Sequence, residues 1–483
     1  MWNCDYASCG KPSVRQIGGC MICNQHLCAK HLKAEYHKCP TWEDEKTYFP
    51  AARQAEKEEI TRLLQKINVA ALISRASTLR DGIPCTVPHN LKYDHETCSK
   101  VMGGMNYHIE ILFEDGVSWL TRIRRRNATS PPPELQSYIV RSEVATLQFL
   151  ARINVPTPAV HDFDADPDNP VGVPYILMEK LAGRSVGSSL NLAWMPEKRR
   201  KVLGQLADVY VALLSHPMEK MGSLMPVDVD QQIQAVGLGL GSGSAVGPFA
   251  VESLTDRGRA GASLEMTGPC CSAQEYYRAG IELTLDLILR QEIYTGRPID
   301  AYLVHRFLLD NVAKVFAYND LDDGRFYLRH ADDKGDHILV DEEFNITGII
   351  DWEWAYTAPR SVAFNSPIAL IPVAEFYDGG NRIGDDEVTF AELLEEKGHP
   401  DLGEIVRSGR LLHRFDFCCG YDISDWDSFL GLFFGLLNGL GDPFLKGLGD
   451  SKQLNWEIWK TDAMERYWDD ERLQKLIEAT NFF

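Results

Sequence analysis

Two aspartates between residues 330 and 352 have the spacing that phosphoryl-transfer chemistry needs. Asp332 follows His330 in His-Ala-Asp, and Asp351 lies in the run Ile-Ile-Asp-Trp. Phosphoryl transfer uses one carboxylate to orient the attacking hydroxyl and another to hold the metal ion that bridges the phosphates. A single aspartate in a turn usually has a structural role, but the complete spacing is far rarer by chance. These residues therefore indicate a kinase-type catalytic pair.

Two short strands must position this pair. Branched aliphatic residues at 338–340 and again at 346–350 predict two strands. The segment between them contains Asn345 and predicts a turn. We therefore expect Asp332 in the loop before the first strand and Asp351 at the end of the second, so that both carboxylates reach one place.

These residues resemble the aminoglycoside phosphotransferase/choline kinase-like family, whose motifs are H-x-D-x-x-x-x-N and a later I-D-W. The resemblance implies an α+β, protein kinase-like two-lobed fold. It also implies that Asp332 and His330 are catalytic and that Asp351 binds magnesium or manganese. The metal-binding asparagine of the family is replaced here by His337. Because a neutral imidazole suits zinc or manganese better than magnesium, His337 is expected to have a weaker metal role.

The same resemblance implies a nucleotide site in a small lobe. Gly103 and Gly104 precede a strand–turn–strand pattern, and glycines let backbone amides approach phosphate groups. Arg122 takes the position of the phosphate-contacting lysine of the family and keeps its positive charge with another geometry. Glu143, in the helix predicted over 134–150, would be the ion-pair partner of Arg122. Without the resemblance, Glu143 is equally well interpreted as a surface residue of that helix.

A further small-lobe feature is the apolar run 173–178, which predicts a strand. The resemblance implies that this strand leads to a hinge, where the backbone from Glu179 to Leu181 would hydrogen-bond the adenine of ATP. Apolar strands that end in a charged pair are common in other folds, so the residues alone leave this role open.

The first 39 residues hold a second set of side chains with a chemical role. Six of the twelve cysteines recur there with two histidines, namely Cys4, Cys9, Cys20, Cys23, Cys28, His31, His37 and Cys39. Eight thiolate and imidazole donors are enough for two closed, tetrahedral zinc sites. So short a segment buries too little apolar surface to fold alone, and metal binding would supply its folding free energy.

This series resembles the AN-one-type zinc finger, in which the ligands of two structural zinc ions interleave. The resemblance implies one set of Cys4, Cys9, Cys28 and His31, and a second set of Cys20, Cys23, His37 and Cys39. Fingers of this type are usually interaction modules, in several cases linked to ubiquitin or protein quality control. A protein partner is therefore expected through the finger.

The length of 483 residues suggests two to four domains. We expect a zinc finger over 1–45, a helical linker over 46–100 that connects to the main domain or packs on it, a kinase-like small lobe over 101–180, and a mainly helical large lobe over 181–483 with the catalytic loop and the metal aspartate. The Gly/Ser-rich stretch 237–247 is expected to be a loop or lid near the acceptor site.

The net charge of -20 argues against a nucleic-acid partner and against a membrane-surface partner. The arginines at 122 and 124–126 are better interpreted as a solvated strand edge than as a nucleic-acid site, because their flanks are not basic. The start of the chain lacks the features of a signal peptide, and no apolar run is long enough to span a bilayer. A cytoplasmic or nuclear protein is expected, and in such reducing compartments cysteines serve as metal ligands or core thiols.

Two functions follow from these residues. The first is an ATP-dependent phosphotransferase that acts on a hydroxyl of a small molecule and carries a zinc-binding interaction module. The alternative is a kinase-like binding protein or adaptor with weak or no catalysis, recruited through the finger. His337 favours the alternative, whereas the retention of both Asp332 and Asp351 favours the enzyme. We expect the enzyme.

Overall fold

The computed structural model describes residues 2–15, 17–87, 91–96, 98–187, 195–226, 244–250, 267–317, 321–423, 425–445 and 451–481. The chain forms two compact units. Unit 1 comprises Met1–Gly183, Ser223–Met266 and Thr347–Ala355, and unit 2 comprises Arg184–Gly222, Thr267–Ile346 and Tyr356–Phe483. Of the stretch 237–247, the expected loop or lid, residues 237–243 lie outside the described residues. Residues 244–247 form a strand rather than a loop.

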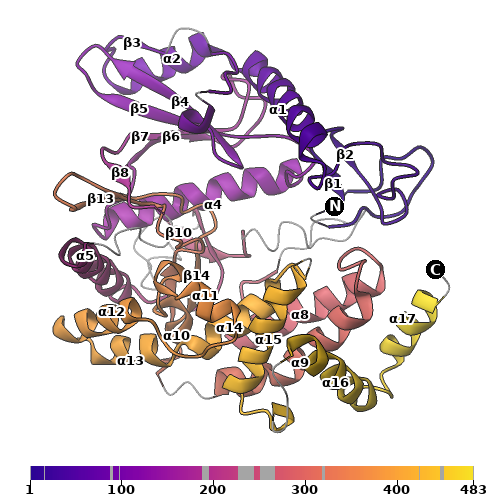
Figure 1. The fold of residues 1–483 in the computed structure, drawn as a ribbon. Coiled ribbons are helices and arrows are strands. Elements are labelled where there is room, and N and C mark those ends of the chain that lie inside the picture. The colour runs from indigo at the N-terminus through magenta and orange to yellow at the C-terminus, as the bar shows by residue number, and fades with distance from the viewer. Residues whose placement is uncertain are drawn as a thin grey trace. The chain divides into compact units, whose positions relative to one another are not determined.

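The centre of unit 1 is a five-stranded antiparallel sheet with the order β3-β4-β5-β7-β6 (Figure 1). Its strands are β3 (Cys85–Thr86), β4 (Asn106–Phe113), β5 (Ser118–Arg124), β6 (Val160–Asp164) and β7 (Tyr175–Glu179). Alternate residues of β4 are buried, from Tyr107 to Phe113, as a period of two requires for a sheet with one face on a core. The predicted strand–turn–strand pattern is therefore confirmed. The expectation of a solvated strand edge for the arginines is wrong, because β5 is an inner strand and Arg122, Arg124 and Arg125 are buried.

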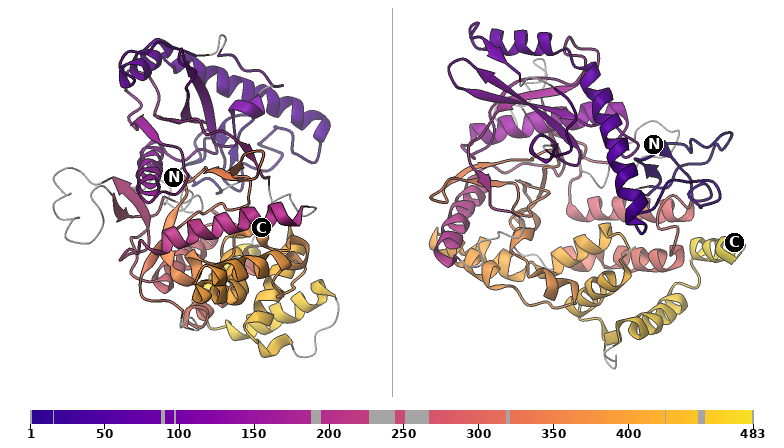
Figure 2. Two further views of the ribbon diagram at one scale, coloured as in Figure 1. Left: turned by 90° about the vertical axis from the view of Figure 1, so that its left-hand side faces the viewer. Right: turned by 45° about the horizontal axis from the view of Figure 1, so that its top comes forward.

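Helices α1 (Glu45–Lys66) and α2 (Val69–Leu79) cover one face of this sheet. Their buried residues, among them Ile60 and Leu72, share one apolar core with the odd-numbered residues Trp119 and Ile123 of β5. The even-numbered residues of β5 point to the opposite face, because side chains alternate along a strand. The C-terminal part of α1, from Glu59, and helix α2 are therefore packed on the sheet. Figures 1 and 2 show α1 running from the N-terminal segment toward the sheet.

Helix α4 (Pro133–Arg152) also contacts β6 and β7, and β9 and β10 lie beside it. The remaining elements of unit 1 are β1 (Gly19–Cys20), β2 (Gln25–His26), α3 (Cys98–Val101), β9 (Ser223–Pro226), β10 (Ser244–Gly247) and most of β13 (Ile346–Ile349).

The N-terminal segment, with its β1–β2 hairpin, has a small core of its own formed by Cys4, Leu27 and Cys28. It contacts the β5–α4 connection closely at Gly19, where an added Cβ would lie 2.6 Å from the Ala128 carbonyl oxygen. This contact requires glycine, because any side chain at position 19 would collide with backbone.

Unit 2 is mainly helical (Figures 1 and 2). Its core is rich in aromatic residues, among them Phe415, Phe429 and Phe433. Its helices are α5 (Pro196–Leu214), α8 (Ala273–Leu289), α9 (Pro298–Ala317), α10 (Arg360–Ala363), α11 (Val373–Tyr377), α12 (Asp385–Glu396), α13 (Pro400–Ser408), α14 (Arg410–Gly420), α15 (Trp426–Gly439), α16 (Lys452–Arg466) and α17 (Glu471–Asn481), with short 3-10 helices at Ile368–Leu370 and Pro443–Leu445. The predicted α+β class is confirmed.

Four short strands of unit 2 form two antiparallel pairs, and two of these strands flank the loop that carries Asp332. Strand β11 (Phe326–Arg329) pairs antiparallel with β14 (Tyr356–Pro359), and β12 (Ile338–Val340) pairs antiparallel with β8 (Arg184–Ser185). Residues 330–337 form the loop between β11 and β12, so the expected strand after Asp332 is present. Within the described residues, no helix combines the length and the low polarity that a membrane span requires.

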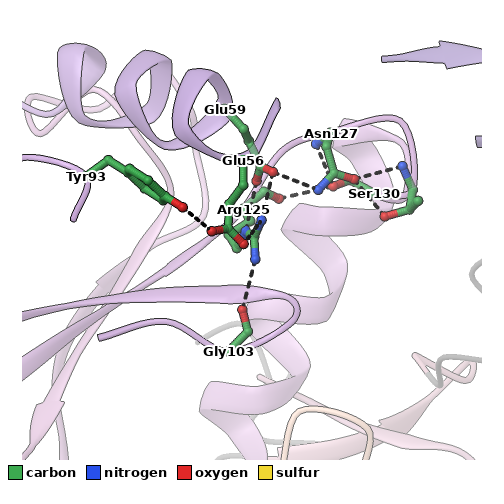
Figure 3. A network of polar contacts seen from close by, with 8 residues as sticks. Glu56, Glu59, Tyr93, Gly103, Arg125, Asn127 and Ser130 are labelled. Carbon is green, nitrogen blue, oxygen red and sulfur yellow. Dashed lines mark hydrogen bonds and ion pairs between the residues drawn. The ribbon is translucent and has the colours of Figure 1, made fainter. Parts of the chain in front are cut away.

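A buried ion pair fixes α1 to the end of β5 (Figure 3). Arg125 donates from Nε and Nη2 to the two carboxylate oxygens of Glu59, at 2.9 and 2.8 Å, and both side chains are buried. Asn127 Nδ2 donates to the same carboxylate at 3.1 Å. Arg125 Nη1 also donates to the Gly103 carbonyl at 3.1 Å. Helix α1 is thus attached to the sheet by charge as well as by apolar packing.

We predict that Glu59→Ala lowers the free energy of unfolding of unit 1 by about 3 kcal/mol, because it leaves the buried Arg125 guanidinium without its carboxylate. Urea unfolding, with hydrogen exchange followed in α1 and β5 peptides, measures the effect. The matched control is the exposed neighbour, Glu58→Ala, whose contact with Arg62 is 4.0 Å long and is worth at most about 0.5 kcal/mol. Equal losses in the two variants would contradict the prediction.

Candidate active site and metal clusters

Arg122 is the centre of a cluster of charges in unit 1. It lies on the face of β5 opposite the α1–α2 core, and its Nε is 3.3 Å from Glu143 Oε1 on α4. Its Nη2 is 2.8 Å from Asp351 Oδ1 and 3.0 Å from Glu353 Oε2. The side chains of Arg122, Glu143 and Glu353 are at most 9% exposed, whereas Asp351 is 46% exposed. The structure therefore contains the expected Arg122–Glu143 ion pair and joins it to Asp351.

Glu353 is a member of this cluster that sequence reasoning missed. Its Oε2 accepts hydrogen bonds from Arg124 Nη1 at 2.8 Å and from Asn106 Nδ2 at 3.2 Å. Its position two residues after Asp351 is visible in the sequence. The two arginines that pair with it, Arg122 and Arg124, lie on β5, far from it along the chain. With every group ionised, two arginines face three carboxylates and one negative charge remains. That surplus favours a cation or a proton at the cluster.

The backbone at Asp351 has a φ of 66°, in the left-handed region. For a residue with a Cβ this conformation costs about 1 kcal/mol of conformational free energy, and such strain is typical of functional sites. The neighbouring Trp352 is buried, and its Nε1 donates to the Ile349 carbonyl at 3.0 Å, which closes the turn after β13. Ile349 N in turn donates to the Pro156 carbonyl at 2.8 Å. The turn that presents the Asp351 carboxylate is therefore held from both sides.

The electrostatics of the cluster depend on its burial. Burial raises the pKa of Glu143 to about 7. Arg122 opposes this shift, whereas the carboxylates of Glu353 and Asp351 add to it. On β4, burial and then Arg122 lower the pKa of His108 to about 4, so this imidazole adds no positive charge near neutral pH.

In unit 2, the loop 330–337 places His330 and His337 with stacked rings, 4.2 Å between centroids. The Asp332 amide donates to His330 Nδ1 at 3.2 Å, and the Gly335 amide donates to His337 Nδ1 at 3.3 Å. Burial holds the pKa of His337 well below its ordinary value, so the ring is neutral. A neutral ring that accepts at Nδ1 carries its proton on Nε2 and has no lone pair left for a metal ion. This geometry argues against the metal role expected for His337.

Asp332 and its neighbour Asp333 differ sharply in environment. The Asp332 side chain is 41% exposed, and its Oδ2 lies 3.0 Å from Nζ of the half-exposed Lys334. Asp333 is buried, and its Oδ1 accepts from the Ile368 amide at 3.0 Å. Only Asp332 of these two presents a carboxylate that an outside hydroxyl could reach.

The other residues expected to contact nucleotide lie just before β4, at Gly103 and Gly104, and at the end of β7, from Glu179 to Leu181. An added Cβ at Gly103 or Gly104 would meet nothing within 4 Å, so packing does not require glycine at either position. At the end of β7, the Glu179 amide donates to the Ala159 carbonyl at 2.8 Å and the Lys180 amide to the Ser118 carbonyl at 3.4 Å. Two of the three hinge amides from Glu179 to Leu181 are thus used inside the sheet.

The eight cysteine and histidine residues of the N-terminal segment form two groups. Cys4, Cys9, Cys28 and His31 make one, and Cys20, Cys23, His37 and Cys39 make the other, each with all ligand atoms within 4.8 Å of one another. The Cys9–Cys28 sulfur distance is 3.7 Å, and Cys4 Sγ lies 3.2 Å from His31 Nδ1. The edge of a tetrahedron with zinc–sulfur bonds of about 2.3 Å is about 3.8 Å. The donor sets and their spacing fit zinc.

We predict that Glu143→Gln removes a pH-dependent part of the stability of unit 1. A carboxyl group whose pKa is raised from 4.5 to about 7 in the folded state binds its proton more tightly when folded, so its contribution to stability falls as the pH rises through that window. Glutamine cannot ionise. The variant should therefore gain in melting temperature relative to wild type between about pH 5 and about pH 8. Glu134→Gln, exposed on the same helix, should follow wild type throughout. A Glu143→Gln curve parallel to wild type would contradict the prediction.

Comparison with known proteins identifies the family to which the chain belongs. Residues 115–362, just over half of the chain, match the model named APH, described as the phosphotransferase enzyme family. Two Aspergillus fumigatus proteins, each named subtelomeric hrmA-associated cluster protein, from strains CBS 144.89 and ATCC MYA-4609, are 31% identical over 123 residues. The match covers 25% of this chain and 23% of each relative, so the chain spans about a quarter of the length of these curated relatives.

Solved structures with partial similarity include three phosphotransferases. A GDP complex of aminoglycoside 2'-phosphotransferase-IIIa is 16% identical with a TM-score of 0.39, over 78% of this chain and 99% of that one. Macrolide 2'-phosphotransferase type I is 16% identical with a TM-score of 0.37, over 78% and 97%. Aminoglycoside phosphotransferase APH(4)-Ia is 12% identical with a TM-score of 0.40, over 79% and 99%. These structural similarities are too weak to carry an argument. On the match over residues 115–362, the chain belongs to the phosphotransferase enzyme family.

Proposed function

We propose that this chain is an ATP-dependent phosphotransferase that transfers a phosphoryl group to a hydroxyl of a small molecule. The observation that carries the proposal is the Arg122 cluster, where one buried cation meets Glu143 of α4 and the half-exposed carboxylate of Asp351. A cation for phosphate charge beside a carboxylate for a metal ion is the arrangement that phosphoryl transfer requires. Membership of the phosphotransferase family supports it.

The nucleotide would be held by residues of unit 1. Arg122 would bind phosphate oxygens with its forked donors, and Glu143 and Glu353 would hold the guanidinium in place. The open space at Gly103 and Gly104 leaves room for phosphates to approach backbone amides. At the hinge, Leu181 is the residue that we assign to adenine, because the amides of Glu179 and Lys180 already bond within the sheet.

Magnesium or manganese would be held by Asp351, whose carboxylate oxygens suit these oxygen-seeking ions. When bound, such an ion neutralises charge on the phosphates. The Oδ1 atom of Asp351 is bonded to Arg122 at 2.8 Å, and this contact would have to exchange for metal and phosphate when nucleotide binds. Arg122 therefore orients the carboxylate when no nucleotide is bound.

Asp332 would orient the acceptor hydroxyl and take its proton. Its exposure leaves it open to an acceptor, and its backbone amide is fixed by His330 Nδ1. We assign to His330 and His337 the role of fixing this loop. His330 accepts from the Asp332 amide and His337 from the Gly335 amide, so His337 does not bind metal. On that assignment the change from asparagine to histidine removes one metal ligand but not the catalytic carboxylate. This favours the enzyme over a kinase-like adaptor.

We also propose that the N-terminal segment is a finger with two structural zinc ions that recruits a protein partner. The two donor sets and their tetrahedral spacing support the zinc ions. The close contact at Gly19 supports a finger that is attached to unit 1 rather than freely hinged.

We expect ATP with magnesium or manganese to raise the melting temperature of the wild type. Asp351→Asn should lose the metal-dependent part of that shift, because an amide binds these ions more weakly than a carboxylate. Differential scanning fluorimetry with nucleotide and metal varied separately measures both effects. A wild type that shows no metal- and nucleotide-dependent shift would refute the proposed phosphotransferase.

Asp332→Asn should keep the nucleotide shift but lower phosphoryl transfer at least about 100-fold, since only the general base is removed. A screen of hydroxyl-bearing small molecules that follows ADP release identifies the acceptor and provides the assay. The control is Asp336→Asn, an exposed aspartate of the same loop, which should keep wild-type turnover. Equal rates in wild type and Asp332→Asn would exclude Asp332 as the base.

For the finger, Cys9→Ser and Cys23→Ser should each lower the zinc content of the full chain by one ion, and the double variant by two. The two residues belong to different donor sets, and a set without one thiolate binds zinc far more weakly. Elemental analysis after dialysis against buffered zinc provides the count. Loss of both ions in either single variant would contradict the assignment of independent ligand sets.

A further inference from the structure

A third group of side chains that could hold a metal ion lies outside the finger. Glu56 of α1, His95 and Cys98 place their ligand atoms within 4.8 Å of one another, and among the described residues only three such groups occur, the other two being those of the finger. Cys98 begins α3, and His95 lies just before it in the connection between β3 and β4. The three residues thus bring this connection against α1.

A fourth polar group points to the same place. The Tyr93 hydroxyl donates to Glu56 Oε1 at 2.6 Å and lies 3.3 Å from His95 Nδ1 (Figure 3 shows the contact with Glu56). Glu56, Tyr93 and Cys98 are half-buried, and His95 is exposed. An ion could therefore enter from solvent and still be enclosed on several sides.

The charges around Glu56 leave its carboxylate available. Arg125 Nη2 lies 4.0 Å from Glu56 Oε2, but the guanidinium is already paired with both oxygens of Glu59 at 2.9 and 2.8 Å. The Cys98 thiol donates to the His95 carbonyl at 3.1 Å. Without a metal ion, the site thus holds a carboxylate whose close partner is the neutral Tyr93 hydroxyl, and a thiol bonded only locally.

We propose that Glu56, His95 and Cys98 form a third metal site, specific for zinc or a similar borderline cation. One carboxylate oxygen, one imidazole nitrogen and one thiolate sulfur are the ligand types that zinc accepts, whereas the sulfur excludes magnesium and calcium. Binding displaces the proton of the Cys98 thiol to solvent and forms a zinc–sulfur bond. The fourth position belongs to water or to the Tyr93 hydroxyl.

Such an ion would attach the β3–β4 connection to α1 at residues 93–98. The same connection is held a second time at Gly103, whose carbonyl accepts from Arg125 Nη1 at 3.1 Å. Two attachments on one connection would restrict the segment that carries Gly103 and Gly104. The metal site itself does not depend on the proposed phosphotransferase activity, so the two can fail separately.

The first test is the zinc content of the full-length, untagged chain after dialysis against buffered zinc. Three ions per chain are expected for wild type, and two for His95→Gln and for Cys98→Ser. Cys271→Ser, an exposed cysteine of unit 2, is the control and should keep three. Two ions in wild type, unchanged in His95→Gln, would overturn the proposal.

A second measurement covers the case in which a variant folds poorly. In cadmium-substituted wild type, cadmium NMR should show a third resonance from a site with one sulfur, distinct from the two sulfur-rich finger sites and absent from Cys98→Ser. Hydrogen exchange then shows whether residues 93–98 are protected by a bound metal ion or by the Tyr93–Glu56 hydrogen bond. Protection of residues 93–98 should fall in His95→Gln and persist in zinc-loaded Tyr93→Phe. The reverse pattern would show a hydrogen-bonded turn without metal and would overturn the site.

Discussion

The ion pairs of the buried Arg122 guanidinium are the interactions on which the rest of unit 1 depends. A charge that is 9% exposed needs partners, and the three that it has come from α4 and from the segment 347–355. The sheet, the helix and this late segment are therefore assembled around one cation. Removing the charge would leave Glu143, Asp351 and Glu353 to repel one another, so the fold and the candidate active site rest on the same contact.

Local patterns predicted the parts of the structure that local physics determines. The alternation in β4 and β5, the strand after His330 and the spacing of the cysteines each follow from a few neighbouring residues. Glu353 could not be predicted, because nothing beside it indicates that Arg124 and Asn106 would donate to it. The Glu59–Arg125 pair joins residues 66 positions apart, and no short motif carries that information.

His337 shows why identity at a motif position is a poor guide to its role. The sequence suggested a substituted metal ligand, because the family places asparagine there. The structure shows that Nδ1 is used by the Gly335 amide and that the ring stacks on His330. Which nitrogen of a histidine is available depends on the backbone geometry of its own loop.

The arginine at position 122 has a consequence for how such a protein would be found. A guanidinium stays protonated and is a poor nucleophile, whereas a lysine amine in the same place can be acylated. Reagents that deliver an acyl group from a nucleotide to the phosphate-binding lysine of kinases would find no amine at this position. If Arg122 binds ATP phosphates as proposed, surveys of ATP-binding proteins by lysine labelling would find no reactive amine at this position.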